Sequence, residues 1–342
     1  MFVNVPIPDK DYKVIVRCIT YNQSKYICDA LNGFAIQETN FPFICIVVDD
    51  ASKDGNQDVI KRYANENCDM SKAEISEDDV SKYIRVPHKT NGNCFFLFCF
   101  LNVNLFGKPE KQEIYKPYRA ICEYEAICEG DDYWTDSQKI QKQVDVMTSD
   151  QSVGFVYTGF STVDENGEPR MYPWCEERME RSCSGDIFEK LIDHNMVLTL
   201  TICFRKTLYD KYLEFLKKYS VSIDYFLFLV LAGLSKGIYI DEKMGCYRIN
   251  SNGLVQSSRE RVNALCNKAL IVSSKIYLNG EFFERSFKED LKIRKAIVTK
   301  FLRLVKSNVM TKSEFFKIVS SSFKMICMLC VVFVEMLKKK LL

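Results

Sequence analysis

Residues 13–64 alternate between short apolar runs and helical patterns, and this alternation constrains the fold more than any other feature of the chain. Residues 13–19 are rich in β-branched side chains and predict a strand, which a polar turn and a helical pattern to about Gln37 follow. Residues 43–48 predict a second strand and residues 59–64 a second helix. This order predicts a parallel sheet, with ligands beyond the carboxyl ends of its strands.

Polar side chains follow both of these predicted strands. The first strand ends at Thr20, Tyr21 and Asn22, and the second ends at Asp49 and Asp50. Because parallel strands present their carboxyl ends at one edge of a sheet, these side chains are expected to lie close together and to face a ligand.

A third polar tip is an acidic turn. Residues 124–128 form an apolar run that predicts a buried strand, and Glu129, Asp131 and Asp132 follow it with Gly130 among them. Carboxylates on such a turn can bind a hard divalent cation together with the phosphate oxygens of a substrate. A solvated acidic turn is the alternative, and these four residues alone would favour it. The two other polar tips favour the cation.

Further elements are predicted around these tips. Residues 93–106 are strongly apolar and predict a buried helix, whereas residues 107–118 are charged, contain two prolines and predict an exposed excursion. Downstream, residues 199–204 predict another strand, and Asp224 begins a very apolar helix.

The charge and cysteine content exclude several classes of function. The 47 Lys and Arg residues balance 45 Asp and Glu residues, so the chain has no overall basic field and nucleic acid is not an expected partner. The 15 cysteines form no closely spaced framework, which favours a reducing cytosol. Cys327 and Cys330 have no second cysteine pair and no histidine nearby, so zinc or redox chemistry is not expected there.

The end of the chain has a different texture. From about residue 259 it predicts Lys-rich amphipathic helices without further strands. Residues 325–334 are free of charge, but ten residues are too few to span a bilayer, which needs ~20. With the basic residues 338–340 behind it, this segment predicts peripheral membrane contact. Packing on the domain or on a second subunit is an equally good interpretation, and the oligomeric state stays open.

The three polar tips, in this order, resemble the motifs of family 2 glycosyltransferases of the GT-A fold. Residues 20–22 match the first-strand signature of that family, residues 47–55 match the second, and residues 129–132 match its DxD site. The sequence from residue 128 to residue 145 is similar to bacterial members that build surface polysaccharides.

The resemblance extends over residues 13–250 and implies an α/β fold with a mostly parallel, Rossmann-like sheet flanked by helices. It implies a glycosyltransferase domain at residues 1–258, followed by a helical region at residues 259–342. Within that domain, residues 11–136 would form the nucleotide-binding half and residues 137–258 the acceptor half.

The resemblance also implies roles for the first two tips. Tyr21 would stack on the nucleotide base, and Asp50 would accept a hydrogen bond from a base N–H. Asp49 would contact a sugar hydroxyl or orient the turn. Thr20 and Asn22 would belong to the same nucleotide site.

At the acidic turn, Asp131 is expected to ligate Mn²⁺ or Mg²⁺, with Glu129 near the ribose or in the metal shell. The family usually has Asp where Glu129 stands. Asp224 matches the position of the base that deprotonates the acceptor, although an acid there can also serve only as a helix cap. Arg248 would reach the leaving diphosphate or pair with a structural acid.

The implied activity is inverting, metal-dependent transfer of a single sugar, of the hexosyltransferase type, from a nucleotide diphosphate sugar to a glycan or lipid-linked acceptor. No Gln-x-x-Arg-Trp segment, the mark of processive members, is present in the chain. The expected setting is the cytoplasm, at the inner face of the cell membrane. The alternative is a catalytically inactive nucleotide-sugar-binding or scaffold protein of the same fold.

Overall fold

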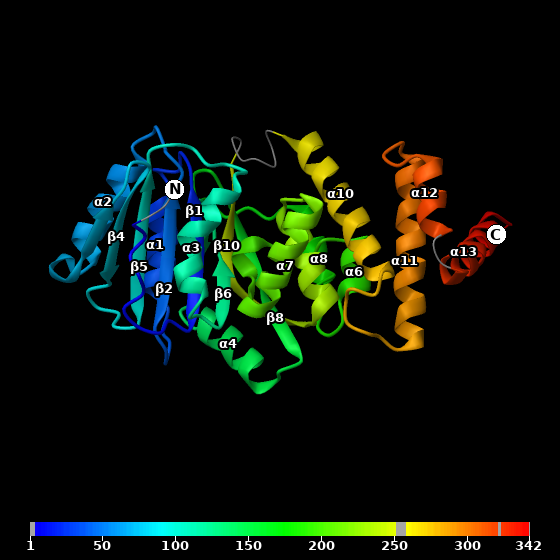
Figure 1. Ribbon diagram of the computed structural model, residues 1–342, viewed down its shortest axis with the longest axis horizontal. Helices are drawn as coiled ribbons and strands as arrows, with labels where there is room; N and C mark the ends of the chain where they lie inside the picture. The colour runs from blue at the N-terminus through cyan, green and yellow to red at the C-terminus, as the bar shows by residue number, and fades with distance from the viewer. Residues whose placement is uncertain (1–3, 251–257, 321–322, 342) are drawn as a thin grey trace.

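The computed structural model describes residues 4–250, 258–320 and 323–341. Its centre is a ten-stranded mixed sheet in the order β3-β4-β5-β2-β1-β6-β9-β8-β10-β7 (Figure 1). The strands are β1 Val14–Thr20, β2 Phe43–Asp49, β3 Glu74–Glu77, β4 Ser81–Pro87, β5 Cys94–Leu101, β6 Tyr124–Ile127, β7 Tyr133–Trp134, β8 Val153–Asp164, β9 Cys203–Arg205 and β10 Lys236–Ile249.

Helices cover both faces of this sheet and extend beyond its end. The helices are α1 Ile27–Ala35, α2 Asn56–Asn67, α3 Gln112–Arg119, α4 Lys139–Ser149, α5 Pro173–Glu180, α6 Phe188–Asp193, α7 Lys206–Tyr219, α8 Asp224–Leu234, α10 Arg259–Leu278, α11 Phe287–Lys306, α12 Lys312–Val319 and α13 Phe323–Leu341. Short 3-10 turns lie at η1 Met70–Lys72, η2 Pro109–Lys111 and η3 Thr199–Thr201.

The predicted parallel sheet is confirmed around β1. This strand pairs in parallel with β2, with Thr20 opposite Asp49, and in parallel with β6, with Arg17 opposite Ile127. β2 is buried along its whole length, as expected for a parallel strand covered on both faces. The register therefore brings the carboxyl ends of β1, β2 and β6 to one edge of the sheet, and all three polar tips begin there.

The predicted helix at residues 93–106 is wrong. Cys94–Leu101 forms β5, which lies between β2 and β4 and is buried at every position. A strand that is covered on both faces has no alternation of polar and apolar residues, so its pattern cannot be distinguished from that of a buried helix.

The predicted exposed excursion at residues 107–118 is also wrong in its second half. Its residues from Gln112 onward form most of α3, which buries Ile114, Tyr115 and Tyr118 completely against the sheet. The two prolines and the charges led to a loop prediction, but the apolar residues recur at helical spacing. The predicted strand at residues 199–204 is shorter, since η3 precedes β9.

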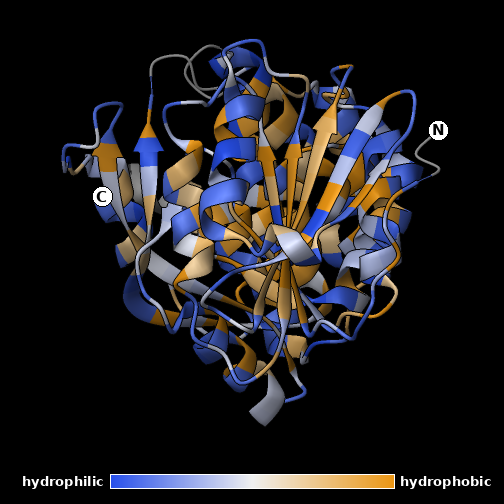
Figure 2. Cartoon of the chain, turned by 90° about the vertical axis from the view of Figure 1, so that its left-hand side faces the viewer, coloured by the Kyte–Doolittle hydropathy of each residue, from blue (hydrophilic) through white to orange (hydrophobic). Residues whose placement is uncertain are grey.

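The helix that Asp224 begins is confirmed as α8. Every residue from Tyr225 to Gly233 in α8 is buried, because α6, α7 and α10 pack around it. The core that includes α8 continues through α10 and α11, so the C-terminal helices share it. Figure 2 shows the apolar strands in the middle of the molecule with more polar helix surfaces outside them.

The C-terminal helices α11, α12 and α13 lie at the end of the long axis opposite α2 and β4 (Figure 1). Within the described ranges, no helix is both long and apolar enough to cross a membrane.

Candidate active site

The first two polar tips are tied to each other by hydrogen bonds. Asn22 adopts a left-handed backbone conformation (φ 53°), and its backbone N–H donates to the Ser52 hydroxyl at 2.9 Å. The Asn22 side-chain oxygen accepts from the backbone N–H of Lys53 at 2.7 Å. Asn56 donates to the Thr20 hydroxyl at 3.0 Å and to the Asp49 carboxylate at 2.7 Å. Thr20 and Asn22 therefore hold the turn at the end of β1.

Asp49 is fully buried within this network. One of its oxygens accepts from the Ser52 backbone N–H at 3.0 Å and from Gln57 at 2.9 Å, while the other accepts from Asn56. Of the two roles open for Asp49 from the sequence, these bonds favour orientation of the turn.

Asp50 lies against a partner that the sequence did not indicate. Its two oxygens accept from the Lys111 ammonium and from the backbone N–H of Leu105, each at 2.6 Å. Both Asp50 and Lys111 are buried. A base N–H at this carboxylate would have to share it with Lys111. Tyr21 follows the neighbouring strand β1, and its ring is 47% exposed and free to stack.

The acidic turn is pressed against the end of β1. The Gly130 backbone N–H donates to the carbonyl of Ile19 at 3.0 Å, and a Cβ on Gly130 would stand 2.6 Å from the Cβ of Thr20. Only glycine allows an approach this close. The turn thereby brings Glu129 and Asp131, the neighbours of Gly130 in the chain, next to the tip that carries Thr20.

Asp131 and Asp132 differ in burial and in their hydrogen-bond partners. Asp131 is half-buried and accepts a hydrogen bond from Asn250 at 3.0 Å, whereas Asp132 is buried and accepts from the Arg248 backbone N–H at 2.8 Å. Burial raises the pKa of Asp131, although Asn250 and Arg248 oppose the shift. Burial and the charge of Asp131 raise the pKa of Asp132 well above its ordinary value. Asp132 is thus a structural acid, and Asp131 is the one open to a ligand.

Glu129 and Asp224 come together although they lie far apart in the sequence. Burial raises the pKa of Glu129 to about 8, and the charge of Asp224 adds to that shift while Arg17 opposes it. Asp224 is reachable by solvent, yet the protein around it also raises its pKa, against the effect of Arg17. Asp224 therefore shares one electrostatic environment with Glu129 and Arg17.

Asp224 does not cap its helix. Ile223 occupies the N-cap position of α8, and no side-chain capping hydrogen bond forms there. No described residue donates a hydrogen bond to the Asp224 carboxylate. Among the described residues, Asp224 therefore does not serve as the helix cap that the sequence left open as its role. Its carboxylate is available to accept a proton.

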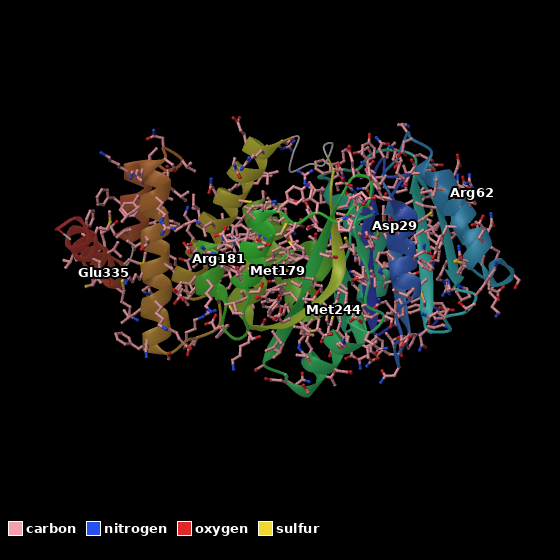
Figure 3. The ribbon with its side chains drawn as sticks, turned by 180° about the vertical axis from the view of Figure 1, so that it is seen from behind. Asp29, Arg62, Met179, Arg181, Met244 and Glu335 are labelled. Atoms are coloured by element: carbon pink, nitrogen blue, oxygen red, sulfur yellow. The ribbon has the colours of Figure 1, made fainter. Side chains whose placement is uncertain are left out.

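Arg248 pairs with an acid of the protein. Its guanidinium donates to Asp29 on α1 at 2.6 Å and to the backbone carbonyl of Asp131 at 3.1 Å. It also lies 4.6 Å from the ring centroid of Tyr26 and 5.5 Å from that of Tyr133. Figure 3 labels Asp29 on α1. Of the two readings of Arg248, the ion pair is the one present, so this residue braces the acidic turn.

A cavity of about 420 Å³ opens beside this ion pair. It is lined by Lys25, Tyr26, Asp29, Tyr133, Glu165, Asn166, Gly167 and Arg248.

A buried charge cluster lies beneath the site and was missed in the sequence. Glu125 on β6 accepts from Arg119 at 2.8 and 3.0 Å and from Arg17 on β1 at 2.9 Å. The ring of Tyr209 lies against both guanidinium groups. A signal for this cluster was available, since one charged residue interrupts each of two apolar strands that pair with each other.

Replacing Glu125 with Gln should lower the free energy of unfolding by about 3–5 kcal/mol, because two buried arginines lose their shared counter-charge. Burial alone would raise the pKa of Glu125, but Arg119 and Arg17 hold it below its ordinary value of 4.5. The carboxylate thus contributes its stability above pH 4.5, and the deficit of the variant should shrink as the pH falls below that value. Denaturant unfolding at several pH values measures both effects.

The control for this measurement is Glu123→Gln. Glu123 forms only a surface contact with Lys13 at 3.9 Å, so its loss should cost about 0–1 kcal/mol. Equal losses in the two variants would contradict a structural role for the buried cluster.

The acidic turn fits a cation that takes most of its ligands from a substrate. Within the described residues, no group of three or more His, Cys, Asp and Glu side chains is arranged to hold a metal ion unaided. Burial nonetheless raises the pKa of both Glu129 and Asp131, as expected for buried carboxylates whose counter-charge is insufficient. Mg²⁺ commonly binds through one or two carboxylates plus phosphate oxygens and water, and this donor set matches that pattern.

A family model agrees with the first two tips. Residues 16–92 match the model described as glycosyl transferase family 2. The matched segment contains Thr20, Tyr21, Asn22, Asp49 and Asp50 and ends before the acidic turn.

Relatives by sequence are found in mycobacteria. Uncharacterized protein Rv1520 of Mycobacterium tuberculosis is 27% identical over 242 residues, which are 70% of this chain and 60% of that protein. Uncharacterized protein Mb1547 of Mycobacterium bovis aligns with the same values. The chain therefore spans about 60% of the length of these curated relatives.

Solved structures give more distant matches. A crystal structure of S. aureus TarS 1-349 in complex with UDP aligns over 90% of this chain and 75% of that chain, with 15% identity and a TM-score of 0.49. The mannosyltransferase PcManGT from Pyrobaculum calidifontis in complex with GDP-Man and Mn²⁺ aligns over 92% of this chain and 81% of that chain, with 14% identity and a TM-score of 0.42.

Proposed function

We propose that this protein, which contains a family 2 glycosyltransferase domain, transfers a single sugar from a nucleotide diphosphate sugar to a glycan or lipid-linked acceptor with inversion at the anomeric carbon. The observation that carries the proposal is the meeting of the acidic turn at Glu129 with the uncapped carboxylate of Asp224. The acidic turn suits the binding of a diphosphate with its cation, and the Asp224 carboxylate suits the removal of a proton from the acceptor.

The nucleotide would bind at the first two tips. The exposed ring of Tyr21 offers a stacking surface for the base, and the Asp50 carboxylate offers an acceptor for a base N–H beside the Lys111 ammonium. Thr20, Asn22 and Asp49 support this pocket from beneath, because their hydrogen bonds fix the two turns.

Glu129 and Asp131 would hold Mn²⁺ or Mg²⁺ together with the donor's phosphate oxygens. When bound, such an ion neutralises negative charge that develops on the departing nucleoside diphosphate. The structural acid Asp132 and the Arg248–Asp29 pair keep the turn in place for this task. Arg248 would act on the diphosphate only through that turn, since its own guanidinium is engaged.

Asp224 would act as the general base. Its carboxylate takes the proton of the acceptor hydroxyl while that oxygen forms a bond to the anomeric carbon. The bond between this carbon and the phosphate oxygen breaks on the opposite face, and its electron pair leaves with the nucleoside diphosphate. A pKa above the ordinary range suits a carboxyl group that must accept a proton near neutral pH.

Transfer of one sugar per encounter is proposed because the chain contains no Gln-x-x-Arg-Trp segment. The proposed setting is the synthesis of a cell-surface polysaccharide, in the cytoplasm at the inner face of the cell membrane. This setting suits a lipid-linked or growing glycan acceptor.

A second candidate is a nucleotide-sugar-binding or scaffold protein without turnover. The observation that favours it is the buried ion pair of Asp50 with Lys111, because Lys111 occupies the carboxylate that is proposed to bind the nucleotide base. The glutamate at position 129, where the family usually has aspartate, is consistent with it as well.

Incubation with a panel of nucleotide diphosphate sugars, Mn²⁺ or Mg²⁺ and a bacterial membrane extract separates the two candidates. We expect release of nucleoside diphosphate from at least one donor, at a rate that depends on the extract and is absent for heat-denatured protein. Binding of a donor without release would favour the scaffold. A chain that neither binds nor cleaves any donor would contradict both.

A further inference from the structure

The C-terminal helices carry a charge that the chain as a whole does not have. Residues 287–341, which span α11, α12 and α13, contain 13 Lys and Arg residues against 4 Asp and Glu residues, a net charge of +9. The whole chain has a net charge of only +2. The positive charge is therefore concentrated at one end of the long axis (Figure 1).

The few acids of these helices are already engaged. Glu289 and Glu314 close capping boxes at the starts of α11 and α12, Asp290 binds Arg294 at 2.9 Å, and Glu335 binds Lys295 at 2.7 Å. Arg303 and Lys324 also pair with acids, Asp193 and Asp290, whereas the remaining lysines among the described side chains of these helices form no salt bridge. Exposed lysines on α11 and α12 are Lys288, Lys292, Lys306, Lys312 and Lys317.

The outermost helix, α13, presents an apolar face to solvent. It packs on α11 and α12 through Met325, Met328 and Val332, which are buried. Its other sides are not covered by any described residue. Figure 3 labels Glu335 on this helix, where it pairs with Lys295 of α11. Large apolar side chains that are 42–50% exposed on α13 are Ile326, Val331, Phe333, Val334 and Met336.

The exposed apolar side chains of α13, with exposed lysines on the neighbouring helices, fit one kind of binding partner better than others. Soluble monomers rarely leave such a contiguous apolar face uncovered. A second copy of this chain would bring a second set of uncompensated lysines to the contact, and like charges oppose that association. An anionic lipid surface supplies both an apolar layer for this face and negative charge for the lysines.

We propose that α13 lies in the interface of an anionic lipid bilayer, with Phe333 and Val334 on the inserted side and the basic helices α11 and α12 over the headgroups. None of the described helices is suited to cross the bilayer, so the contact is peripheral. The sheet, with the candidate active site at its edge, projects away from this end of the molecule (Figure 1). The docking does not depend on the transfer reaction.

Co-sedimentation of the full chain with vesicles tests the proposal. We expect at least tenfold tighter binding to vesicles of phosphatidylcholine with phosphatidylglycerol than to pure phosphatidylcholine, and weaker binding as salt is raised. The double substitution Phe333→Asp and Val334→Asp should abolish vesicle binding. Because both side chains are exposed, the thermal unfolding midpoint should stay unchanged.

The matched control is the double substitution Ile7→Asp and Ile75→Asp, which adds the same two negative charges at exposed apolar residues outside the C-terminal helices and should bind vesicles as wild type does. Equal vesicle binding by the α13 double variant and wild type would overturn the proposal. So would a wild-type dimer in sedimentation velocity that the α13 double substitution dissociates, together with no vesicle binding, because a second copy would then be the occupant.

Discussion

Replacing Asp224 with Asn should lower the rate of sugar transfer about 10²- to 10⁴-fold, the contribution that a positioned general base usually makes. An amide cannot accept the proton of the acceptor hydroxyl at neutral pH. The side chain keeps its size, and no described residue donates a hydrogen bond to the native carboxylate, so the fold should not change. Donor binding should survive, because the donor's diphosphate belongs to the acidic turn.

Initial rates of nucleoside diphosphate release measure this effect. The control is Asp210→Asn on the neighbouring helix α7, where the carboxylate forms only a surface ion pair with Lys206 at 2.8 Å. This variant should turn over as wild type does. Retained turnover in Asp224→Asn would show that another group removes the proton.

Replacing Asp131 with Ala should remove the metal dependence of donor binding. We expect a loss of affinity at least as large as the ~10- to 100-fold that removal of an outer-shell partner of a metal costs. The reason is that Asp131 is the acid of the turn that is open to a ligand, whereas Asp132 is buried against the Arg248 backbone. The charge of Glu129 alone would then face the diphosphate.

Thermal unfolding with a donor, at increasing concentrations of Mn²⁺ or Mg²⁺, measures this loss, since a ligand of the folded state raises the midpoint. Asp58→Ala removes an exposed acid from α2 and serves as the control. A metal titration of Asp131→Ala that matches wild type would exclude Asp131 as a ligand.

The edge of the sheet could be predicted from sequence because its signals are local. The β-branched run of β1 and the apolar run of β2 each end directly on polar residues, and parallel pairing brings such ends together. Asp224 was identified in the same way, as an acid at the start of an apolar helix. Its freedom from capping was not predictable, because it depends on which residue occupies the N-cap position.

The partners of the site residues could not be predicted, because they depend on contacts between distant segments. Lys111 reaches Asp50 across 61 residues, from a segment whose charges and prolines indicated a loop. Arg17 reaches Glu125 across 108 residues. Burial also conceals the type of an element, as β5 shows, since a strand without a polar face has the same composition as a buried helix.

The central claim is that the two halves of the site have separate tasks, with the donor and its cation at the acidic turn and the proton at α8. The most direct test is a paired measurement of metal-dependent donor binding and donor turnover on Asp131→Ala and Asp224→Asn. We predict that Asp224→Asn binds donor as wild type does and turns it over about 10²- to 10⁴-fold more slowly, while Asp131→Ala loses metal-dependent binding. If both variants keep turnover, or if both lose donor binding to the same extent, the claim of separate tasks for the two halves of the site is contradicted.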